Sequence, residues 1–386
     1  MKNNNLHISM NHFTHASRVM KEIKTILKHT NTDSVFIAAI HKENILEEED
    51  LLTNVSLKRF KLNSKKLPKT LIFQLIKYIE FSMKICSFYK NKNIKMINVH
   101  SLALLPLGVL LKIVFKAVLI YDTHELETET RNLSGIRKFL SKGLESVLFR
   151  FCDGVICVNK SISQWYQERY KMEAPPAIVI NTPVFKKINK KKNLFREEFG
   201  IDEQTKIYLY QGGLTIGRNI ETLLTTFSEY NDAKSKRAIV FMGYGILEDK
   251  VKAYAKKNSN IFFKPAVSQN DLMDYTSSAD VGFVLIDKGA LNNQFSLPNK
   301  LFEYAMAGLA IIASDNIEIK NFVEHYNCGF CLSEISPDTI NKLLNEFEKK
   351  TVHIFSQNAL KMFEENNWSH QEEILKEFYS EIITIK

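Results

Sequence analysis

Two short segments in the second half of the sequence combine residue types that suit an anionic ligand. The first, residues 210–219, reads Tyr-Gln-Gly-Gly-Leu-Thr-Ile-Gly-Arg-Asn and lies between an apolar run and a helical pattern. Glycines such as Gly212 and Gly213 let the backbone approach a ligand closely. The following helix offers free N–H groups that favour phosphate, and Arg218 adds a permanent charge. The glycine spacing fits neither the Walker nor the dinucleotide-binding pattern, so a Gly-rich turn with an exposed arginine is the alternative interpretation.

The second segment, residues 295–303, reads Phe-Ser-Leu-Pro-Asn-Lys-Leu-Phe-Glu. We expect Ser296 to cap a helix that starts near Pro298, which would create another helix N-terminus. Lys300 falls in the first turn of this helix, and Glu303 can accept hydrogen bonds from hydroxyl groups such as those of a ribose. Two helix N-termini with an arginine and a lysine at strand ends predict a diphosphate site, because ligands bind at the carboxyl ends of parallel strands.

A third segment, Tyr-Asp-Thr-His-Glu at residues 121–125, directly follows a buried strand in the first half. Asp122, His124 and Glu125 provide acid, base and hydrogen-bonding groups where α/β proteins build active sites. His100 ends a neighbouring strand and is expected to lie nearby. A solvated loop with a structural histidine is the alternative interpretation.

The loop after the first strand also borders the expected cleft. It spans residues 11–17 and carries His12 and His15, with Arg18 immediately after it. We expect these three side chains on the acceptor side, against the alternative of an exposed polar loop. Asp-x-Asp does not occur where a strand ends, so arginine, lysine and helix dipoles would balance the charge of a departing diphosphate. The sequence therefore predicts neither a metal ion nor a cofactor.

Strand and helix patterns alternate throughout the chain, which indicates an α/β fold with doubly wound parallel sheets. The polar stretch from Asn181-Thr-Pro183 through Lys186–Lys192 indicates a linker between two domains. The expected strands are Leu6–Met10, Ser34–Ile40, Val55–Leu62, Lys95–Val99, Ala117–Tyr121, Gly154–Val158, Ala177–Ile180, Lys206–Gln211, Arg237–Met242, Asn260–Lys264, Val281–Ile286 and Ala310–Ala313.

The basic excess of the chain lies entirely in its first half. The net charge is +9 over 386 residues, and residues 51–100 hold eleven Lys and Arg against one acid, Glu80. A basic field attracts nucleic acid, an anionic membrane or phosphorylated substrates. The expected phosphate segments lie in the other, acidic half, so we expect no nucleic-acid partner. Solvated lysine-rich faces remain the alternative.

Targeting and redox signals favour a cytoplasmic protein. The five cysteines are sparse and odd in number, which argues against a disulfide framework. Cys328-Gly-Phe-Cys331 lacks a second ligand pair for zinc and fits a pair at a strand edge. The apolar stretch 102–121 contains Pro106 and two lysines, so a buried helix followed by a strand is expected instead of a membrane span. The polar first residues show no signal peptide.

Together these segments make the sequence similar to the bacterial glycosyltransferases of family 4, which have the GT-B fold. The resemblance covers nearly the whole chain, and its motifs are specific in combination. They are Tyr-Asp-Thr-His-Glu-Leu at residues 121–126, Gln-Gly-Gly at 211–213 with Gly-Arg-Asn-Ile-Glu-Thr-Leu at 217–223, Phe-Met-Gly-Tyr-Gly at 241–245, and Ser-Leu-Pro-Asn-Lys-Leu-Phe-Glu-Tyr-Ala-Met-Ala-Gly at 296–308.

The resemblance implies two Rossmann-like domains that face each other across a cleft. Residues 1–184 would bind the acceptor and residues 185–366 the nucleotide-sugar. Residues 367–386, with an expected capping box at Ser369-His-Gln-Glu372, would form a helix that crosses back to the first domain. The implied donor-binding residues are Gly212, Gly213, Arg218, Gly243, Tyr244, Pro265, Ala266, Ser296, Leu297, Pro298, Asn299, Lys300 and Glu303.

The resemblance also assigns roles. Arg218 and Lys300 would bind the donor diphosphate, Glu303 the ribose, and the strand end at residues 264–267 the nucleobase, while His124 would contact the transferred sugar. Two positions depart from the family pattern. The first glutamate of a common pair falls on Phe295, which leaves the donor sugar open, and a usual lysine falls on Leu223, so Lys300 would take its place.

The implied activity is transfer of a sugar from a nucleotide-sugar to a saccharide acceptor, with retained anomeric configuration. If the enzyme inverts instead, His124, Asp122 or Glu125 must be the base. The basic first half and the apolar region 73–88 favour a lipid-linked acceptor at the inner membrane face, in the synthesis of lipopolysaccharide or capsule. A nucleotide-sugar epimerase with the same fold and a catalytically silent partner subunit are the alternatives.

Overall fold

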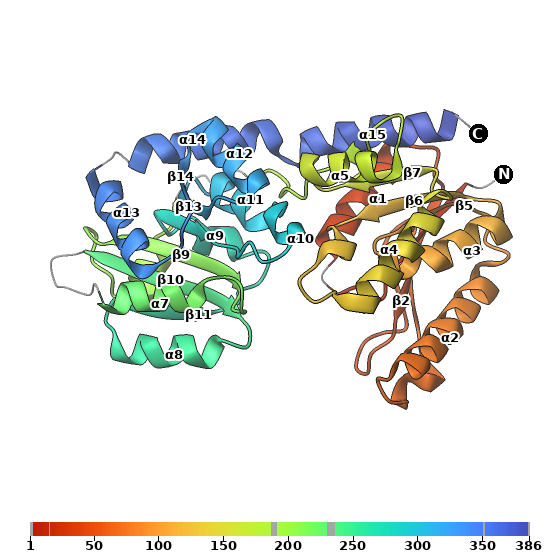
Figure 1. Ribbon diagram of the computed structural model, residues 1–386, viewed down its shortest axis with the longest axis horizontal. Helices are drawn as coiled ribbons and strands as arrows, with labels where there is room; N and C mark the ends of the chain where they lie inside the picture. The colour runs from red at the N-terminus through yellow and green to blue at the C-terminus, as the bar shows by residue number, and fades with distance from the viewer. Residues whose placement is uncertain (1–2, 15, 187–190, 230–235, 350–351, 385–386) are drawn as a thin grey trace. The chain divides into compact units, whose positions relative to one another are not determined.

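The chain folds into two compact units, each built around one parallel sheet. The computed structural model describes residues 3–14, 16–186, 191–229, 236–349 and 352–384 (Figure 1). The first unit comprises Met1–Val179 and Glu372–Lys386, and the second comprises Ile180–Gln371. The predicted linker at residues 186–192 lies partly outside the described residues.

The first unit alternates strands and helices as the sequence predicts. Most of the expected strands are present with their ends shifted by one or two residues. Its elements are β1 (Asn4–Ile8), α1 (Ser17–His29), β2 (Ser34–Ile40), β3 (Glu48–Leu52), β4 (Val55–Phe60), η1 (Asn63–Lys66), α2 (Leu71–Tyr89), β5 (Ile94–Val99), η2 (Leu102–Leu104), α3 (Leu105–Phe115), β6 (Val118–Thr123), η3 (Glu127–Glu129), α4 (Gly135–Phe149), β7 (Gly154–Cys157), α5 (Lys160–Tyr170), β8 (Ala177–Ile178) and part of α15 (Trp368–Thr384).

The sheet of the first unit has the order β3-β4-β2-β1-β5-β6-β7-β8. Every pair is parallel except β3 with β4. Strand β3 was not predicted because its sequence, Glu-Glu-Asp-Leu-Leu, is acidic. Charged residues are typical of an edge strand, since they discourage pairing with another chain. The central strand β6 is buried along its whole length, as expected for a parallel sheet covered on both faces.

Helices cover both faces of this sheet. Figure 1 shows α1 and α15 on one side, and α2, α3 and α4 on the other. Helix α3 follows β5 and returns to β6, so the apolar stretch 102–121 is a helix and a strand, as predicted. None of the helices in the described part of the chain combines the length and apolar character needed to cross a membrane.

The second unit continues the alternation, and it contains one strand, β14, that was not predicted. Its elements are α6 (Leu194–Phe199), β9 (Lys206–Gly213), α7 (Ile220–Glu229), β10 (Arg237–Tyr244), α8 (Glu248–Lys257), β11 (Ile261–Pro265), α9 (Leu272–Thr276), β12 (Val281–Val284), α10 (Leu291–Gln294), α11 (Asn299–Met306), β13 (Ala310–Ser314), α12 (Ile317–Tyr326), β14 (Gly329–Leu332), α13 (Pro337–Lys349) and α14 (Val352–Asn366).

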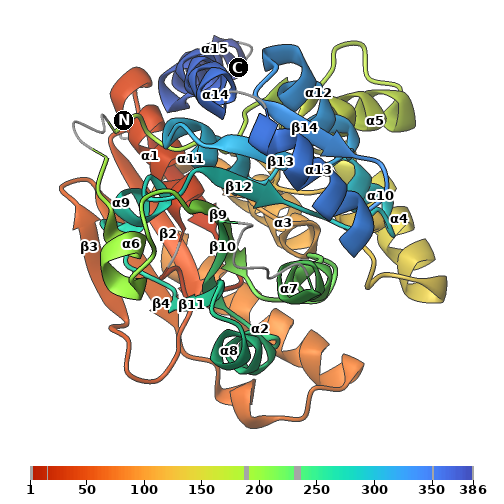
Figure 2. The same cartoon turned by 90° about the vertical axis from the view of Figure 1, so that its left-hand side faces the viewer.

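The sheet of the second unit has the order β11-β10-β9-β12-β13-β14, and all pairs are parallel. The strand order reverses between β9 and β12, which makes this the topological switch point where α/β sheets bind ligands. Two separate apolar cores lie on the two faces, one under α11, α12 and α14 and the other under α7, α8 and α13. Figure 2 shows α7 and α8 on one side of the strands and α11 and α12 on the other. The predicted α/β fold class with two doubly wound sheets is confirmed.

The C-terminal part of α15 packs into the first unit. Leu375, Tyr379 and Ile382 are buried, and the Tyr379 hydroxyl donates to Asn98 Oδ1 at 2.9 Å. A Cβ atom on Gly154 would lie 2.2 Å from Ile382 Cδ1, so a larger residue in β7 would have to displace the side chain that α15 places there. Glu372 adds ion pairs with Lys28 and His29 at its periphery.

Two helix caps differ from their predictions. The Ser296 hydroxyl donates to the Asn293 carbonyl instead of capping α11, because Ser296 lies in the turn that follows α10 and not at the N-cap. Asn367, rather than Ser369, caps α15: its Oδ1 accepts the Ser369 N–H at 2.9 Å.

The cysteine pair is structural. Cys328 precedes and Cys331 lies in β14, the edge strand of its sheet, as the sequence analysis expected. Both thiols are free, and burial raises the pKa of each to about 12. Neither therefore forms a thiolate at neutral pH.

Truncating Tyr379 tests the attachment of α15. We expect Tyr379→Ala to lower the free energy of unfolding of the first unit by about 3–5 kcal/mol, because it leaves a cavity and an unpaired Asn98 carbonyl oxygen. Urea denaturation followed by circular dichroism measures the loss. The control is Glu377→Ala on the exposed side of the same helix, for which we expect less than about 0.5 kcal/mol. Equal effects of the two changes would show that α15 contributes little packing energy.

Candidate functional site

The carboxyl ends of three neighbouring strands in the second unit form a surface of bare backbone. Gly212, Gly243 and Pro265 lie in register on β9, β10 and β11. A Cβ atom on Gly243 would lie 1.9 Å from the Gly212 carbonyl oxygen, so only glycine fits there. Gly212 itself has φ of +113°, a conformation that L side chains rarely adopt. The Gly-rich segment thus removes side chains where a ligand can approach the main chain.

A cavity of about 340 Å³ opens above this surface. It combines the ends of β9, β10 and β11 with the first turns of α11, so it lies beside the switch point of the sheet. Its lining residues are Gln211, Gly212, Met242, Gly243, Tyr244, Ala266, Val267, Leu272, Pro298, Asn299, Lys300 and Glu303.

Lys300 adds a basic side chain to the wall of this cavity. It lies in the first turn of α11, and its Nζ is 4.0 Å from the centre of the Tyr210 ring, an attractive cation–π contact. The Nζ also lies 3.6 Å from where a Gly212 Cβ would be, so a larger residue at Gly212 would press on the ammonium group. Burial, together with the nearby charge of Arg218, lowers the pKa of Lys300 to about 7, although Glu303 opposes the shift.

Glu303 is held in place by a chain of polar side chains. Its Oε2 accepts from Gln211 Nε2 at 2.5 Å, and Gln211 Oε1 accepts from the Thr276 hydroxyl at 2.8 Å. The Tyr304 hydroxyl accepts from the Gln211 N–H at 2.9 Å, which fixes the strand against α11. The carboxylate is therefore oriented at the cavity wall, where it can accept hydrogen bonds from a ligand's hydroxyl groups.

Arg218 provides a second positive charge close to Lys300. It lies before α7, and its charge contributes to lowering the pKa of Lys300. Helices α7 and α11 both begin on this side of the sheet, and the first N–H groups of each helix have no intrahelical partner. Two like charges and two helix N-termini repel one another in the free protein, and a ligand with two negative phosphates would relieve that repulsion.

The structure brings most of the predicted donor-side residues together and separates a few. Gly212, Gly243, Tyr244, Ala266 and Lys300 line the cavity with the other α11 residues. Five predicted residues do not line it: Gly213, Arg218, Pro265, Ser296 and Leu297. Gln211, Met242 and Leu272 line it but were not predicted as site residues, whereas Val267 belongs to the segment 264–267 that was expected at the nucleobase. A polar Gln211 at the end of an otherwise apolar strand was the available signal for one of them.

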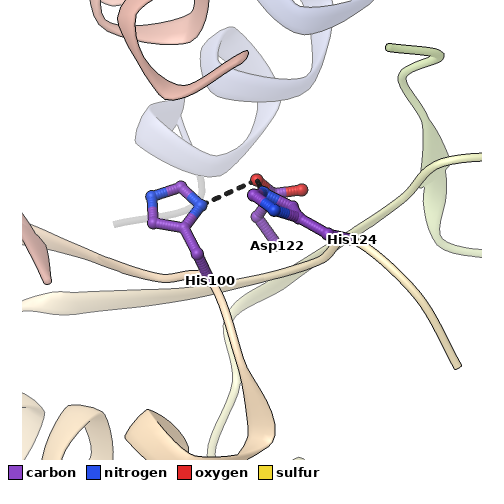
Figure 3. Close-up of side chains that lie close together, drawn as sticks. All are labelled: His100, Asp122 and His124. Atoms are coloured by element: carbon purple, nitrogen blue, oxygen red, sulfur yellow. Dashed lines mark hydrogen bonds and ion pairs between the residues drawn. The ribbon is translucent and has the colours of Figure 1, made fainter. Parts of the chain in front are cut away.

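The first unit gathers a separate set of polar side chains around Asp122. This residue ends β6, is 1% exposed, and lies between His100, which follows β5, and His124. Asp122 Oδ2 is 2.9 Å from His100 Nδ1 and 2.8 Å from His124 Nε2. Figure 3 shows both imidazole rings turned toward this carboxylate. The predicted proximity of His100, Asp122 and His124 is what the structure shows.

The direction in which each pKa is shifted indicates which groups of this cluster carry a proton. Burial alone would raise the pKa of Asp122, but Arg18, His124 and His100 hold it well below its usual range, so the carboxyl is ionised. Burial lowers the pKa of His100 and that of His7, so both rings are neutral. His100 Nδ1–H then donates to Asp122, and His7 Nδ1–H donates to His100 Nε2 at 2.9 Å. His7 was not predicted, although a histidine in a fully buried strand is a recognisable signal.

Arg18 lies beneath this cluster and not at the surface. Its guanidinium donates to Asp122 Oδ1 at 2.9 Å and to the Val179 carbonyl at 2.8 Å, and the residue is 5% exposed. Glu22 Oε1, one turn along α1, lies 2.8 Å from Arg18 Nε, and burial together with the charge of Asp122 raises the pKa of Glu22 well above its usual range. A buried arginine that donates to Asp122 is suited to positioning this carboxylate, and it has little access to an acceptor.

The remaining predicted first-unit residues lie apart from the cluster or cannot be placed. His12 Nδ1 is bound to the Ile40 carbonyl oxygen at 2.9 Å, which ties the loop to β2. The side chain of Glu125 is exposed, and its carbonyl oxygen accepts the Thr123 hydroxyl at 2.6 Å. His15 lies outside the described residues.

The Asp122 cluster can act as an oriented base. With His124 Nε2–H donated to Asp122, the lone pair of His124 resides on Nδ1, and His124 is 35% exposed. In the described residues, the ligand atoms of His100, Asp122 and His124 also lie within 4.8 Å of one another, which is close enough for a metal ion. Arg18 on the same carboxylate opposes a second cation there.

Residues 191–367 match the family described as glycosyl transferases group 1. No curated protein matches the chain by sequence. Among solved structures, sucrose-phosphate synthase from Thermosynechococcus elongatus is similar, with a TM-score of 0.79, 14% identity and 100% of both chains covered. HepE from Anabaena, solved with UDP and glucose, has a TM-score of 0.71 and 14% identity over 98% of this chain and 99% of its own. WaaG, a glycosyltransferase involved in lipopolysaccharide biosynthesis, has a TM-score of 0.68 and 15% identity, with 97% of this chain and 99% of the WaaG chain covered.

The low pKa of Lys300 predicts pH-dependent binding of a diphosphate ester. In the free protein the pKa of Lys300 is about 7, and a bound diphosphate raises it. At pH values between these two pKa values, binding is therefore accompanied by the uptake of a proton. We expect affinity for a diphosphate diester to be highest below pH 7. It should fall as pH rises above 7, by up to about tenfold per pH unit, until the pH reaches the pKa of Lys300 in the bound form. Calorimetry at pH 8 in two buffers of different ionisation enthalpy measures the proton uptake.

A diphosphate diester is the appropriate probe because its phosphates do not titrate in this range. Lys300→Met should abolish the proton uptake, whereas Lys252→Met, which removes an ion pair with Glu248 on α8, should not change it. Binding by the unmodified protein that is independent of pH between 6.5 and 8.5 would contradict the prediction.

Proposed function

We propose that this chain is a glycosyltransferase that uses a nucleoside diphosphate sugar as donor and a saccharide as acceptor, because residues 191–367 match the family described as glycosyl transferases group 1 and the chain has the GT-B fold. The observation that supports the donor class best is Lys300: a cation of lowered pKa in the first turn of α11, beside Arg218 and a glycine-lined strand end. A bound anion would stabilise the charged form of Lys300.

The proposed reaction breaks the bond between the anomeric carbon and the diphosphate oxygen, and it forms a bond from that carbon to an acceptor hydroxyl. Negative charge develops on the departing diphosphate, where Lys300, Arg218 and the N-termini of α7 and α11 stabilise it. In the retaining mechanism that we favour, an oxygen of the departing diphosphate takes the proton of the acceptor hydroxyl. This chemistry requires no metal ion, and unchanged turnover in EDTA is the expected result.

The rest of the nucleotide fits the remaining cavity wall. Glu303, oriented by Gln211, is placed to accept hydrogen bonds from the ribose hydroxyls. Ala266 and Val267, at the end of β11, provide apolar contact for the nucleobase. HepE, which has a similar fold, was solved with UDP and glucose, and a uridine nucleotide is accordingly the first donor to test.

A second mechanism is supported by one specific observation, the Asp122–His124 hydrogen bond. If the enzyme inverts the anomeric configuration, His124 Nδ1 would take the acceptor proton, and Asp122 would stabilise the imidazolium that forms. The anomeric configuration of the product, read from its proton coupling constant by NMR, distinguishes the two mechanisms.

For the acceptor we propose a lipid-linked saccharide in the synthesis of bacterial lipopolysaccharide or capsule, at the inner face of the membrane. The excess of eleven basic residues against one acid in residues 51–100 supports an anionic surface as partner. WaaG, the similar structure mentioned above, is itself involved in lipopolysaccharide biosynthesis. The proposal places the protein in the cytoplasm, as a peripheral membrane protein of the hexosyltransferase type.

Two alternatives remain distinguishable by experiment. A nucleotide-sugar epimerase would convert the donor without any acceptor, and the new epimer would appear by NMR. A catalytically silent partner subunit is favoured by Phe295, which stands where the family commonly has a donor-sugar glutamate. Such a subunit would bind the donor without turnover under any acceptor condition.

A donor screen tests the proposed function. We expect one class among UDP-, GDP-, dTDP- and ADP-sugars to raise the melting temperature of the protein without added metal. Arg218→Ala with Lys300→Ala should abolish this shift, because the diphosphate would lose both cations. Removal of Lys300 alone should lower kcat by about 10²–10³-fold, the magnitude typical of a lost group that stabilises developing charge.

The matched control is Lys252→Ala with Lys256→Ala, which also removes two cations from the second unit, on α8. This control should keep the donor shift and turnover. If no donor class shifts the melting temperature of the unmodified protein, the proposed donor site is wrong.

Replacing His124 by asparagine tests the role of the first unit in turnover separately from donor binding by the second unit. Because the donor cavity contains no residue of the first unit, we expect His124→Asn to lower turnover at least about tenfold while the donor dissociation constant changes less than about twofold. Turnover should fall further, by about 10²–10⁴-fold, if His124 is the base of an inverting reaction. Unchanged turnover would exclude His124 from both roles.

A further inference from the structure

Three neighbouring helices of the first unit show apolar side chains to solvent. On α2, Leu71 is 81% exposed and Ile72 is 71% exposed, and the pattern continues along one side of the helix. On α4, Ile136 and Phe139 are 78% and 77% exposed. The other exposed apolar residues are Leu75, Ile76, Ile79, Met83 and Phe88 on α2, Leu110, Ile113 and Val114 on α3, and Leu140, Leu144 and Val147 on α4.

These exposed side chains share one face of the unit. Each helix buries its opposite side toward the sheet, with Phe81 on α2, Leu111 on α3 and Phe149 on α4. The Tyr78 hydroxyl on α2 accepts the Leu107 N–H of α3 at 2.9 Å, and Lys112 of α3 donates to the Phe151 carbonyl after α4 at 2.7 Å. Figure 1 shows α2, α3 and α4 on the same side of the first unit's sheet. We call their outward side the α2–α4 face.

A groove of about 720 Å³ lies between α2 and α3 within this face. Its lining is predominantly apolar, and one basic residue, Lys90, stands among the lining residues at the end of α2. An apolar channel of this volume matches the hydrocarbon chain of a lipid. The apolar residues that line it include Ile79, Met83, Cys86, Leu107, Leu110 and Val114.

Positive charges accompany the apolar side chains. Lys65, Lys66 and Lys69 are exposed just before α2, and Arg137 and Arg150 are exposed on and after α4. The acids of the same helices are occupied: Glu80 accepts from Ser64 and pairs with Lys84, and Glu145 is buried under three tyrosine hydroxyls. The α2–α4 face is thus both apolar and positively charged.

We propose that the α2–α4 face inserts into the headgroup region of an anionic phospholipid leaflet, with lipid hydrocarbon chains in the groove between α2 and α3. An apolar helix side flanked by lysine and arginine is the composition of interfacial helices, and apolar patches of this extent are unusual on soluble monomers. A second copy of the chain fits less well, since its own basic residues would meet the same charges. The proposal rests on the proposed lipid-linked acceptor, and it adds apolar insertion to attraction by charge alone.

Vesicle sedimentation with the full chain tests this proposal. The probes are phosphatidylcholine vesicles with and without 30% phosphatidylglycerol. We expect Ile136→Ser, Phe139→Ser and Leu140→Ser together to weaken binding to the anionic vesicles at least about tenfold, because three apolar side chains no longer leave water. These residues are exposed, so the fold should be unaffected. Charge reversal at Lys65, Lys66 and Lys69 should also weaken binding.

The matched control is Ile317→Ser, Ile354→Ser and Ile374→Ser, three exposed isoleucines outside the α2–α4 face, and it should bind like the unmodified protein. Apolar insertion further predicts that part of the binding survives 1 M salt, where the Debye length is about 3 Å. The proposal is overturned if the unmodified protein does not sediment with the vesicles, or if the α4 variant binds as well as the control. It is equally overturned if light scattering shows a dimer that the α4 variant dissociates while vesicles are not bound.

Donor binding is measured on the same proteins without vesicles, which keeps the two proposals separable. Absence of vesicle binding by the unmodified protein, together with a UDP-sugar melting shift, would reject the α2–α4 face and leave the donor site intact. Vesicle binding without any donor shift would reject the donor site and leave the surface intact.

Discussion

Both units depend on one constraint, the burial of a parallel sheet on both of its faces. Such a sheet has no solvated face on which polar side chains can gather, so they collect where the strands end. In the second unit the ends of β9, β10 and β11 carry Gly212, Gly243 and Pro265 in register. In the first unit the ends of β5 and β6 bring His100 and Asp122 together. The two polar sites follow from the same geometry.

The two sites differ in how their charges are balanced. Asp122 is compensated within the protein by Arg18 and two histidines, which hold its pKa low and keep it ionised. Lys300 lacks a comparable balance, since burial and Arg218 lower its pKa to about 7 while Glu303 only partly opposes them. Asp122 is already ionised and oriented, so its cluster can take part in proton transfer without rearrangement. The charge of Lys300 is incompletely compensated, so its charged form gains stability when an anionic ligand binds. This contrast agrees with a donor diphosphate site in the second unit and an acid–base cluster in the first.

The first unit also exposes many apolar side chains to solvent, on the helices that cover one side of its sheet. Its sheet is covered on one side by α1 and the end of α15, where Tyr379 reaches the buried Asn98. The helices on the other side have apolar residues on both their inner and outer sides, which explains why α2 reads as an almost continuous apolar run in the sequence. A helix that is apolar all round needs a second apolar environment. We propose that contact with a membrane surface supplies this second environment for α2.

The sequence by itself determined the alternation of strands and helices, the Gly-rich and Lys300 segments, and the family resemblance, because these rest on local periodicity and on residue types at short spacing. Tertiary structure decided what local patterns cannot encode. It showed that Arg18 donates a hydrogen bond to Asp122, that Gln211 and Thr276 orient Glu303, and that His7 binds His100. The sequence does not reveal these contacts because they join residues 65 to 104 positions apart. It also corrected the caps: Ser296 and Ser369 have the right chemistry, but the chain turns at a neighbouring residue. The ability of a serine hydroxyl to cap a helix is a property of that residue alone. The residue at which a helix starts depends on how the helix packs against the rest of the protein.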